Sequence, residues 1–136
     1  MVDANVILRR WLTDPAGPVW PLLGSVPRIY AGALPEGFNP ESGLGILIHV
    51  RGGFSEIEMP VIHPSVQITT YAPQNKFAAA RGLYLAIYDW IHGKFKVDFG
   101  SDGHVISCLE EVQGQDIVDP DEGWATVVAF YGMTLR

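Results

Sequence analysis

The 136-residue sequence has little of what marks secreted, membrane-spanning or nucleic-acid-binding proteins. Cys108 is its single cysteine, so an intramolecular disulfide is excluded. Nine basic residues are scattered along the chain and outnumbered by fifteen acidic ones, which gives a net charge of −6. Proteins that neutralise many phosphates need clustered Lys and Arg. Tight binding to nucleic acid is therefore not expected.

Long apolar runs are missing as well. No stretch approaches the roughly 18 apolar residues of a membrane span. Charged residues also interrupt the apolar stretches near the N-terminus, so no signal peptide is evident. We expect a soluble protein that is assembled in the cytoplasm and has no membrane partner. Only 18% of the residues are charged, against about a quarter in ordinary domains, which hints that other chains cover part of the surface.

Motifs for catalysis or metal binding are equally scarce. No two histidines are close in sequence, and one cysteine cannot supply a structural zinc cluster. His104 and Cys108 would lie roughly 13 Å apart along a strand, too far to share a metal. Cys108 is expected to be buried on the same strand face as Ile106.

Residues 100–103 (GSDG) lack the lysine and the following helix of a phosphate-binding loop and predict a hairpin turn. We expect neither a cofactor nor an enzymatic activity, although paired carboxylates are not excluded.

The length fits a single domain, residues 1–136. Apolar spacing predicts helices over residues 3–13 and from 73–76 to 92, the second ended by Gly93. Turn-forming residues predict loops over 15–27, 35–43 and 54–64. Alternation predicts strands over residues 28–31, 44–51, 65–71, 94–99, 104–113 and 124–135. This order indicates an α+β fold, with a mixed or antiparallel β-sheet and helices packed on one face.

The helix over residues 75–92 carries two apolar stripes, where a surface helix usually has a wide polar face. Either the long loops cover the second stripe, or another subunit does. The last strand is apolar on both faces, which is typical of a central strand or of one that reaches an interface. The residues that this pattern offers as a candidate subunit interface are Phe77, Leu83, Tyr84, Trp90 and Tyr131.

An acidic patch precedes the last strand and consists of Asp116, Asp119, Asp121 and Glu122. Its spacing is not that of an EF-hand calcium loop. Three interpretations remain: a solvated turn held by Pro120 and Gly123, docking to a partner, and calcium binding. The sequence favours the solvated turn over docking, and docking over calcium.

Several blocks, in this order, resemble the tail-terminator (tail-completion) proteins of long-tailed bacteriophages. They are residues 28–38 (RIYAGALPEGF), 46–53 (ILIHVRGG), 64–73 (PSVQITTYAP), the alanine-rich helix, and 109–136 (LEEVQGQDIVDPDEGW followed by ATVVAFYGMTLR). The blocks are turns and strands without catalytic content, so their number and order carry the resemblance.

The resemblance implies a virion protein at the head-proximal end of the tail. Such proteins form a ring, usually a hexamer, that caps the tail tube and presents a surface to the head. The implied partners are further copies of the chain, the major tail tube protein and the head–tail connector protein, with DNA only passing through the channel. An acidic balance would suit that channel, because like charges repel. The acidic patch and loop 54–64 are then candidates for docking to tail or head proteins. Two alternatives remain, another head–tail connector or neck protein, and a small-molecule-binding domain or enzyme with a site built from scattered residues.

Overall fold

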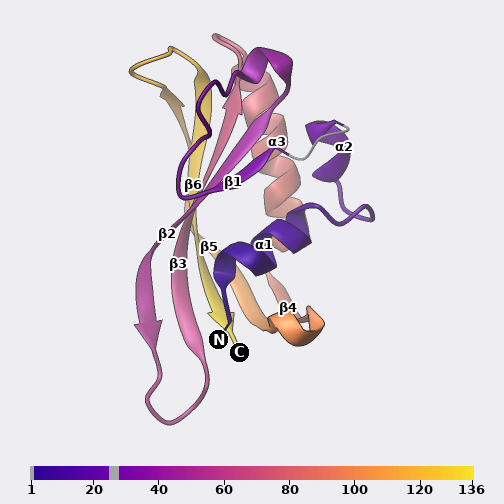
Figure 1. Cartoon of the computed structure of the whole chain (residues 1–136), viewed down its shortest axis with the longest axis vertical. Coiled ribbons are helices and arrows are strands. Elements are labelled where there is room, and N and C mark those ends of the chain that lie inside the picture. Colours follow the sequence, from indigo (N-terminus) through magenta and orange to yellow (C-terminus); the bar gives the residue numbers. More distant parts are fainter. Residues whose placement is uncertain (1, 25–27) are drawn as a thin grey trace.

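The computed structural model describes residues 2–24 and 28–136, so part of the expected 15–27 connection lies outside the described residues. Two longer helices and a six-stranded sheet account for most of the described chain (Figure 1). The elements are α1 (Ala4–Leu12), α2 (Trp20–Leu23), β1 (Ile29–Ala31), η1 (Pro40–Ser42), β2 (Gly45–Ser55), β3 (Ile62–Ala72), α3 (Phe77–Ile91), β4 (Lys94–Asp98), η2 (Gly100–Asp102), β5 (His104–Val118) and β6 (Ala125–Leu135). Among the described residues, no helix is long and apolar enough to cross a membrane.

The sheet has the strand order β1-β2-β3-β6-β5-β4. Every neighbouring pair is antiparallel except β1 and β2, which are parallel. The sheet is therefore mixed, and the α+β prediction is confirmed. The last strand, β6, lies between β3 and β5, which explains why its sequence is apolar on both faces.

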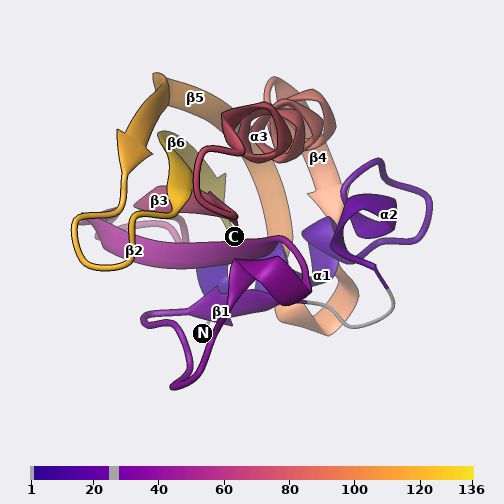
Figure 2. The same cartoon turned by 90° about the horizontal axis from the view of Figure 1, so that it is seen from above.

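One face of the sheet, here called the inner face, packs against α1 and α3 (Figure 2). Helix α3 contacts β3, β6 and β5, while α1 contacts β2 and α3. The inner face of β6 is buried along its whole length, through Ala125, Val127, Ala129, Tyr131, Met133 and Leu135. Alanines at two of these six positions let the helix approach the sheet closely, while Tyr131 and Met133 fill the space further along.

Bulges curve the sheet and change which face some residues occupy. The 15-residue strand β5 slips in register against β6 at three places, the first between Val105 and Ser107. An extra residue at that place turns Ile106 outward, so that Cys108 faces the core together with Val105. The prediction that Cys108 shares a face with Ile106 was therefore wrong, although Cys108 is buried as expected.

Strand β2 also contains a bulge, at residues 51–53, where the end of a strand was predicted. The register shifts between Val50 and Gly53, and the strand then continues to Ser55. Strand β3 also begins earlier than predicted, at Ile62. Most of the predicted loop over residues 54–64 is consequently the far end of a β-hairpin, which we call the arm (residues 53–63).

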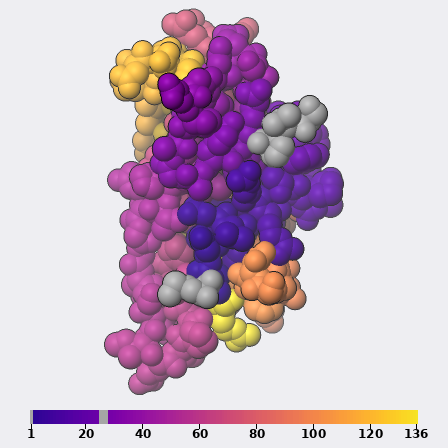
Figure 3. All heavy atoms as spheres, in the orientation of Figure 1, coloured from indigo at the N-terminus to yellow at the C-terminus, as the bar shows by residue number. Residues whose placement is uncertain are grey.

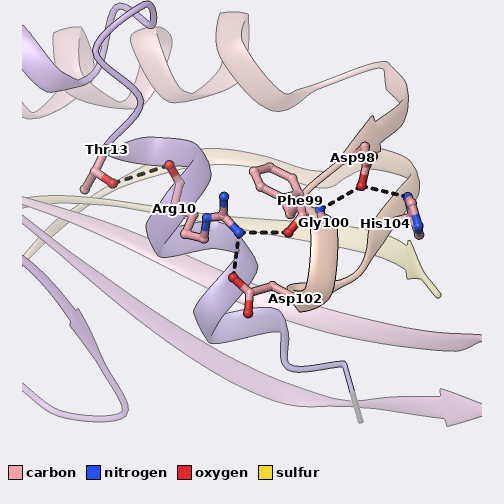
Figure 4. Close-up of polar contacts among 7 residues, drawn as sticks. All are labelled: Arg10, Thr13, Asp98, Phe99, Gly100, Asp102 and His104. Atoms are coloured by element: carbon pink, nitrogen blue, oxygen red, sulfur yellow. Dashed lines mark hydrogen bonds and ion pairs between the residues drawn. The ribbon is translucent and has the colours of Figure 1, made fainter.

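The N-terminal helix is held to the β4–β5 turn by Arg10 (Figure 4). Its guanidinium donates one hydrogen bond of 2.8 Å to the Phe99 carbonyl and one of 2.6 Å to the Asp102 carboxylate. The Phe99 ring in turn packs edge-on against Trp11 of the same helix, with 5.8 Å between the ring centroids. These contacts fix helix α1 at one end of the sheet. Its own sequence did not predict which element it would pack against.

Replacing Arg10 with alanine should lower the free energy of unfolding by about 1 kcal/mol, because it removes two charge-assisted hydrogen bonds at a partly exposed site. Urea denaturation measures this change. Arg9→Ala is the matched control, since the Arg9 side chain is exposed and forms no hydrogen bond with another described residue. It should change stability by less than about 0.5 kcal/mol. Equal losses in the two variants would contradict the role of Arg10.

Candidate interaction surfaces

Helix α3 was expected to offer a subunit contact, but much of its second apolar stripe is covered from within. Leu83, Tyr84 and Tyr131 belong to the subunit's own core, so they cannot reach another subunit in this fold. Trp90 donates a 2.8 Å hydrogen bond from its indole nitrogen to the Trp11 carbonyl. It also lies over Gly17, where a Cβ atom would come within 2.7 Å of the indole ring. Of the five predicted interface residues, Phe77 and Trp90 keep part of their surface accessible.

A polar network joins the middle of α3 to β5. The Tyr84 hydroxyl donates a 2.6 Å hydrogen bond to the Glu110 carboxylate, and burial together with this bond raises the pKa of Tyr84. Arg81 lies over the Tyr84 ring and donates a 2.8 Å hydrogen bond to Asp116. Burial also raises the pKa of Tyr131. Through the bond from Arg81, Asp116, the first carboxylate of the acidic patch, is tied to helix α3.

The remainder of the acidic patch forms an ordered turn. The Asp119 carboxylate accepts a 2.7 Å hydrogen bond from the backbone N–H of Glu122, and the Asp119 carbonyl accepts one of 2.9 Å from Gly123. Asp121 and Glu122 are exposed. Within the described ranges, no three His, Cys, Asp or Glu side chains gather in a way that could hold a metal ion. Two of the four carboxylates therefore have partners inside the subunit, and two face solvent.

The sequence offered residues 54–64 as a docking candidate but predicted a loop there, not the projecting hairpin of the arm. It projects beyond the body of the molecule at the end near the two chain termini, and is drawn in magenta at the bottom of Figure 3. Its tip has the sequence Glu56–Ile57–Glu58–Met59, in which Ile57 is fully exposed and Met59 is half exposed. Phe54, 67% exposed, adds a third apolar group at its base. The alternation of acidic and apolar residues was the available signal, because a solvated loop gains nothing from isoleucine and methionine.

The base of the arm is fixed in place. Gly53 has a positive φ of 125°, and a Cβ atom there would lie 2.1 Å from the His63 carbonyl oxygen. The His63 ring stacks on Phe54 with 4.3 Å between centroids, and its Nε2 lies 2.9 Å from the Glu56 carboxylate. Its Nδ1 lies 3.2 Å from the hydroxyl of Thr134 on the neighbouring strand β6. The arm is therefore anchored to the sheet up to Glu56.

Away from the arm, an open groove of about 630 Å³ lies between η1, the end of α2 and the start of α3. We call it the η1 groove. Its apolar wall is formed mainly by Leu22, Leu23, Pro40, Leu44 and Ala79. Its polar lining includes Arg28, Lys76 and Glu41. Neither Arg28 nor Lys76 forms an ion pair with another residue of the described chain.

The outer face of the sheet, turned away from α1 and α3, is partly covered at one end by an aromatic cluster. Phe38 packs edge-on against Tyr30, Tyr71 and Trp124, with ring centroids 5.6–5.8 Å apart. A Cβ atom at Gly45 would come within 2.5 Å of the Phe38 ring, so glycine is needed for this approach. Further along, the outer face and its margin carry the exposed apolar residues Leu109, Val112 and Ile117.

Two buried titratable groups have pKa values raised by their surroundings. Burial raises the pKa of the Cys108 thiol to about 12, which keeps it protonated at neutral pH and therefore a poor nucleophile. Burial likewise raises the pKa of Tyr71. Such shifts follow from packing in the core, since each is caused first by desolvation.

The fold is similar to that of a solved virion chain. The match is to a chain in the structure titled "Virion of native gene transfer agent (GTA) particle", with a TM-score of 0.69. It covers 97% of this chain and 93% of that chain, at 15% sequence identity. No protein-family model matches the sequence, and no curated protein matches it. The likeness thus establishes a shared fold over nearly the whole length of both chains.

The position of Cys108 in the core predicts that its thiol has no chemical role. Cys108→Ala should cost about 1 kcal/mol of stability, because the cavity left by one sulfur atom is small. In the wild type, an aromatic disulfide reagent should react with the thiol only as fast as the protein unfolds. Rapid reaction of the native protein, or loss of function in a folded Cys108→Ala variant, would contradict this expectation.

The acidic patch can be tested with one variant in which Asp116, Asp119 and Asp121 become Asn and Glu122 becomes Gln. Each change should alter stability by no more than about 0.5 kcal/mol, since the groups are exposed or, at position 119, Asn can still accept the capping bond. A solvated turn predicts normal assembly of particles. Docking predicts a salt-dependent joining defect in a stable protein. Calcium binding predicts a wild-type melting temperature that rises with calcium, and a variant without that response.

Proposed function

We propose that this protein is a structural subunit of a bacteriophage-type tail and acts without catalysis. The observation that carries the proposal is the match over nearly the full length of both chains to a chain whose structure is titled as a virion particle. The pattern of sequence blocks that resembles tail-terminator proteins points in the same direction. So do the exposed apolar groups on the arm, which are suited to contacts between proteins.

Within the tail, we place the protein at the head-proximal end, as a ring that caps the tube and provides the surface for the head. A ring needs two different contact surfaces on each subunit, one for each neighbour. The arm at one end and the η1 groove elsewhere are two such surfaces. Contacts with the tube and the head connector would then use the remaining exposed parts, including the outer face and the acidic patch.

Deleting the gene from a phage or particle-producing strain tests the proposal. We expect filled heads and tails that accumulate separately, with tubes of irregular length because nothing caps them. Electron microscopy of the deletion products and of labelled wild-type particles supplies both measurements. Label on free heads instead of free tails would indicate a connector or neck protein. Normal particles from the deletion strain, or wild-type particles without the protein, would refute the proposal.

A further inference from the structure

The tip of the arm has a composition that solvent alone does not explain. Ile57 is fully exposed and Met59 is half exposed, while Glu58 lies between them. Glu58 forms no ion pair with another described residue, whereas Glu56 is engaged by His63. An apolar pair that flanks an unpaired carboxylate is suited to a groove with an apolar floor and a cationic rim.

The η1 groove of the same chain has these properties. Leucine, proline and alanine side chains form its wall, and two cations against one carboxylate give its lining a net positive charge. Arg28 and Lys76 lack carboxylate partners among the described residues, in a chain whose net charge is −6. An acidic segment that enters this groove would therefore meet positive charge that no carboxylate of the described subunit pairs.

The arm cannot enter the groove of its own subunit, because it projects from the opposite end of the molecule (Figure 1). We propose that the arm tip of one copy docks in the η1 groove of the next copy, with Ile57 and Met59 on the apolar wall and Glu58 beside Lys76 and Arg28. This inference deepens the proposed ring by naming the contact. Because the two surfaces are different, the contact is head-to-tail and propagates around a ring instead of closing at two copies.

A second groove, of about 360 Å³, is also lined by cations, Lys96 and Arg136, together with His104, Val105 and Ile106. It is smaller, and Arg136 also lines the pocket that contains the arm residue Met59. This second groove lies beside the arm of its own subunit, so two copies that face each other could each place an arm in the other's groove, which gives a two-fold dimer. The larger groove, with its longer apolar wall, is therefore the one proposed, and the second serves as the control.

Purified full-length protein tests the contact by cross-linking between two single-site variants, with native Cys108 left in place because it is buried. We expect a short bis-maleimide to join Ile57→Cys to Ala79→Cys as a heterodimer. We expect a chain that carries both substitutions to give a ladder of oligomers. The matched control is Ile57→Cys with Ile106→Cys, which reports on the second groove and should remain monomeric. Cross-linking in the control instead, tip-to-tip dimers of Ile57→Cys alone, or no heterodimer at the highest soluble concentration would each overturn the proposal.

Charge reversal tests the pairing itself within the same assay. Glu58→Lys in the Ile57→Cys chain, or Lys76→Glu in the Ala79→Cys chain, should each lower the yield of the 57–79 cross-link about fivefold. When both chains carry their charge reversal, the yield should recover. Glu122→Lys, an equal charge change on the exposed acidic turn, should leave the yield unchanged. No recovery in the double variant would overturn the assigned pairing. Because the assay uses no particles, a negative result combined with tail-end label in particles would reject this contact and leave the proposed function standing.

Discussion

Burial of the inner face of the sheet beneath α1 and α3 is the interaction on which the rest of this structure depends. Strand β6 lies at its centre, and its six inward side chains are all buried. At a typical value of about 25 cal/mol per Å² of apolar surface, such a strand and helix pair supplies much of the driving force for folding. Since the core uses one face of the sheet, the part of the outer face beyond the Phe38 cluster, the hairpin end and the loop grooves remain free for other contacts.

The sequence was sufficient for the elements that contribute to this core. Alternation along β6 predicted that strand to within one residue, and helical spacing along α3 predicted its end to within one residue and its start just before Phe77, because packing on one side imposes a strict period. The bulges were not predictable in the same way. An extra residue at Ile106 or at 51–52 is defined by the register of the partner strand, and a single strand read alone contains no record of that register. The wrong prediction that Cys108 shares a face with Ile106, and the prediction of a loop in place of the arm, both arise from a bulge that the sequence does not show.

The predicted subunit interface on α3 shows a related limit of prediction from sequence. A helix with two apolar stripes must be covered twice, but the pattern is identical whether the cover is another subunit or a distant part of the same chain. Here the bond between Trp90 and the Trp11 carbonyl, together with the close approach of Gly17, shows that the N-terminal segment supplies part of the cover. The segment 54–64, which was predicted as a loop, carries Ile57 and Met59, apolar groups that no part of the described subunit fully covers.

The construction of the arm bears on how strongly a contact made by its tip can bind. Association loses less conformational entropy when the docking segment is already ordered. Gly53, the stack of His63 on Phe54 and the approach of His63 to Thr134 order the arm as far as Glu56, so mainly its short tip remains to be fixed. A contact of that size is weak between two free copies and becomes strong when several copies are held side by side, since each further contact is then effectively intramolecular. An anchored arm with a small apolar tip therefore suits a subunit that associates weakly in solution and closes into a ring on a symmetric template.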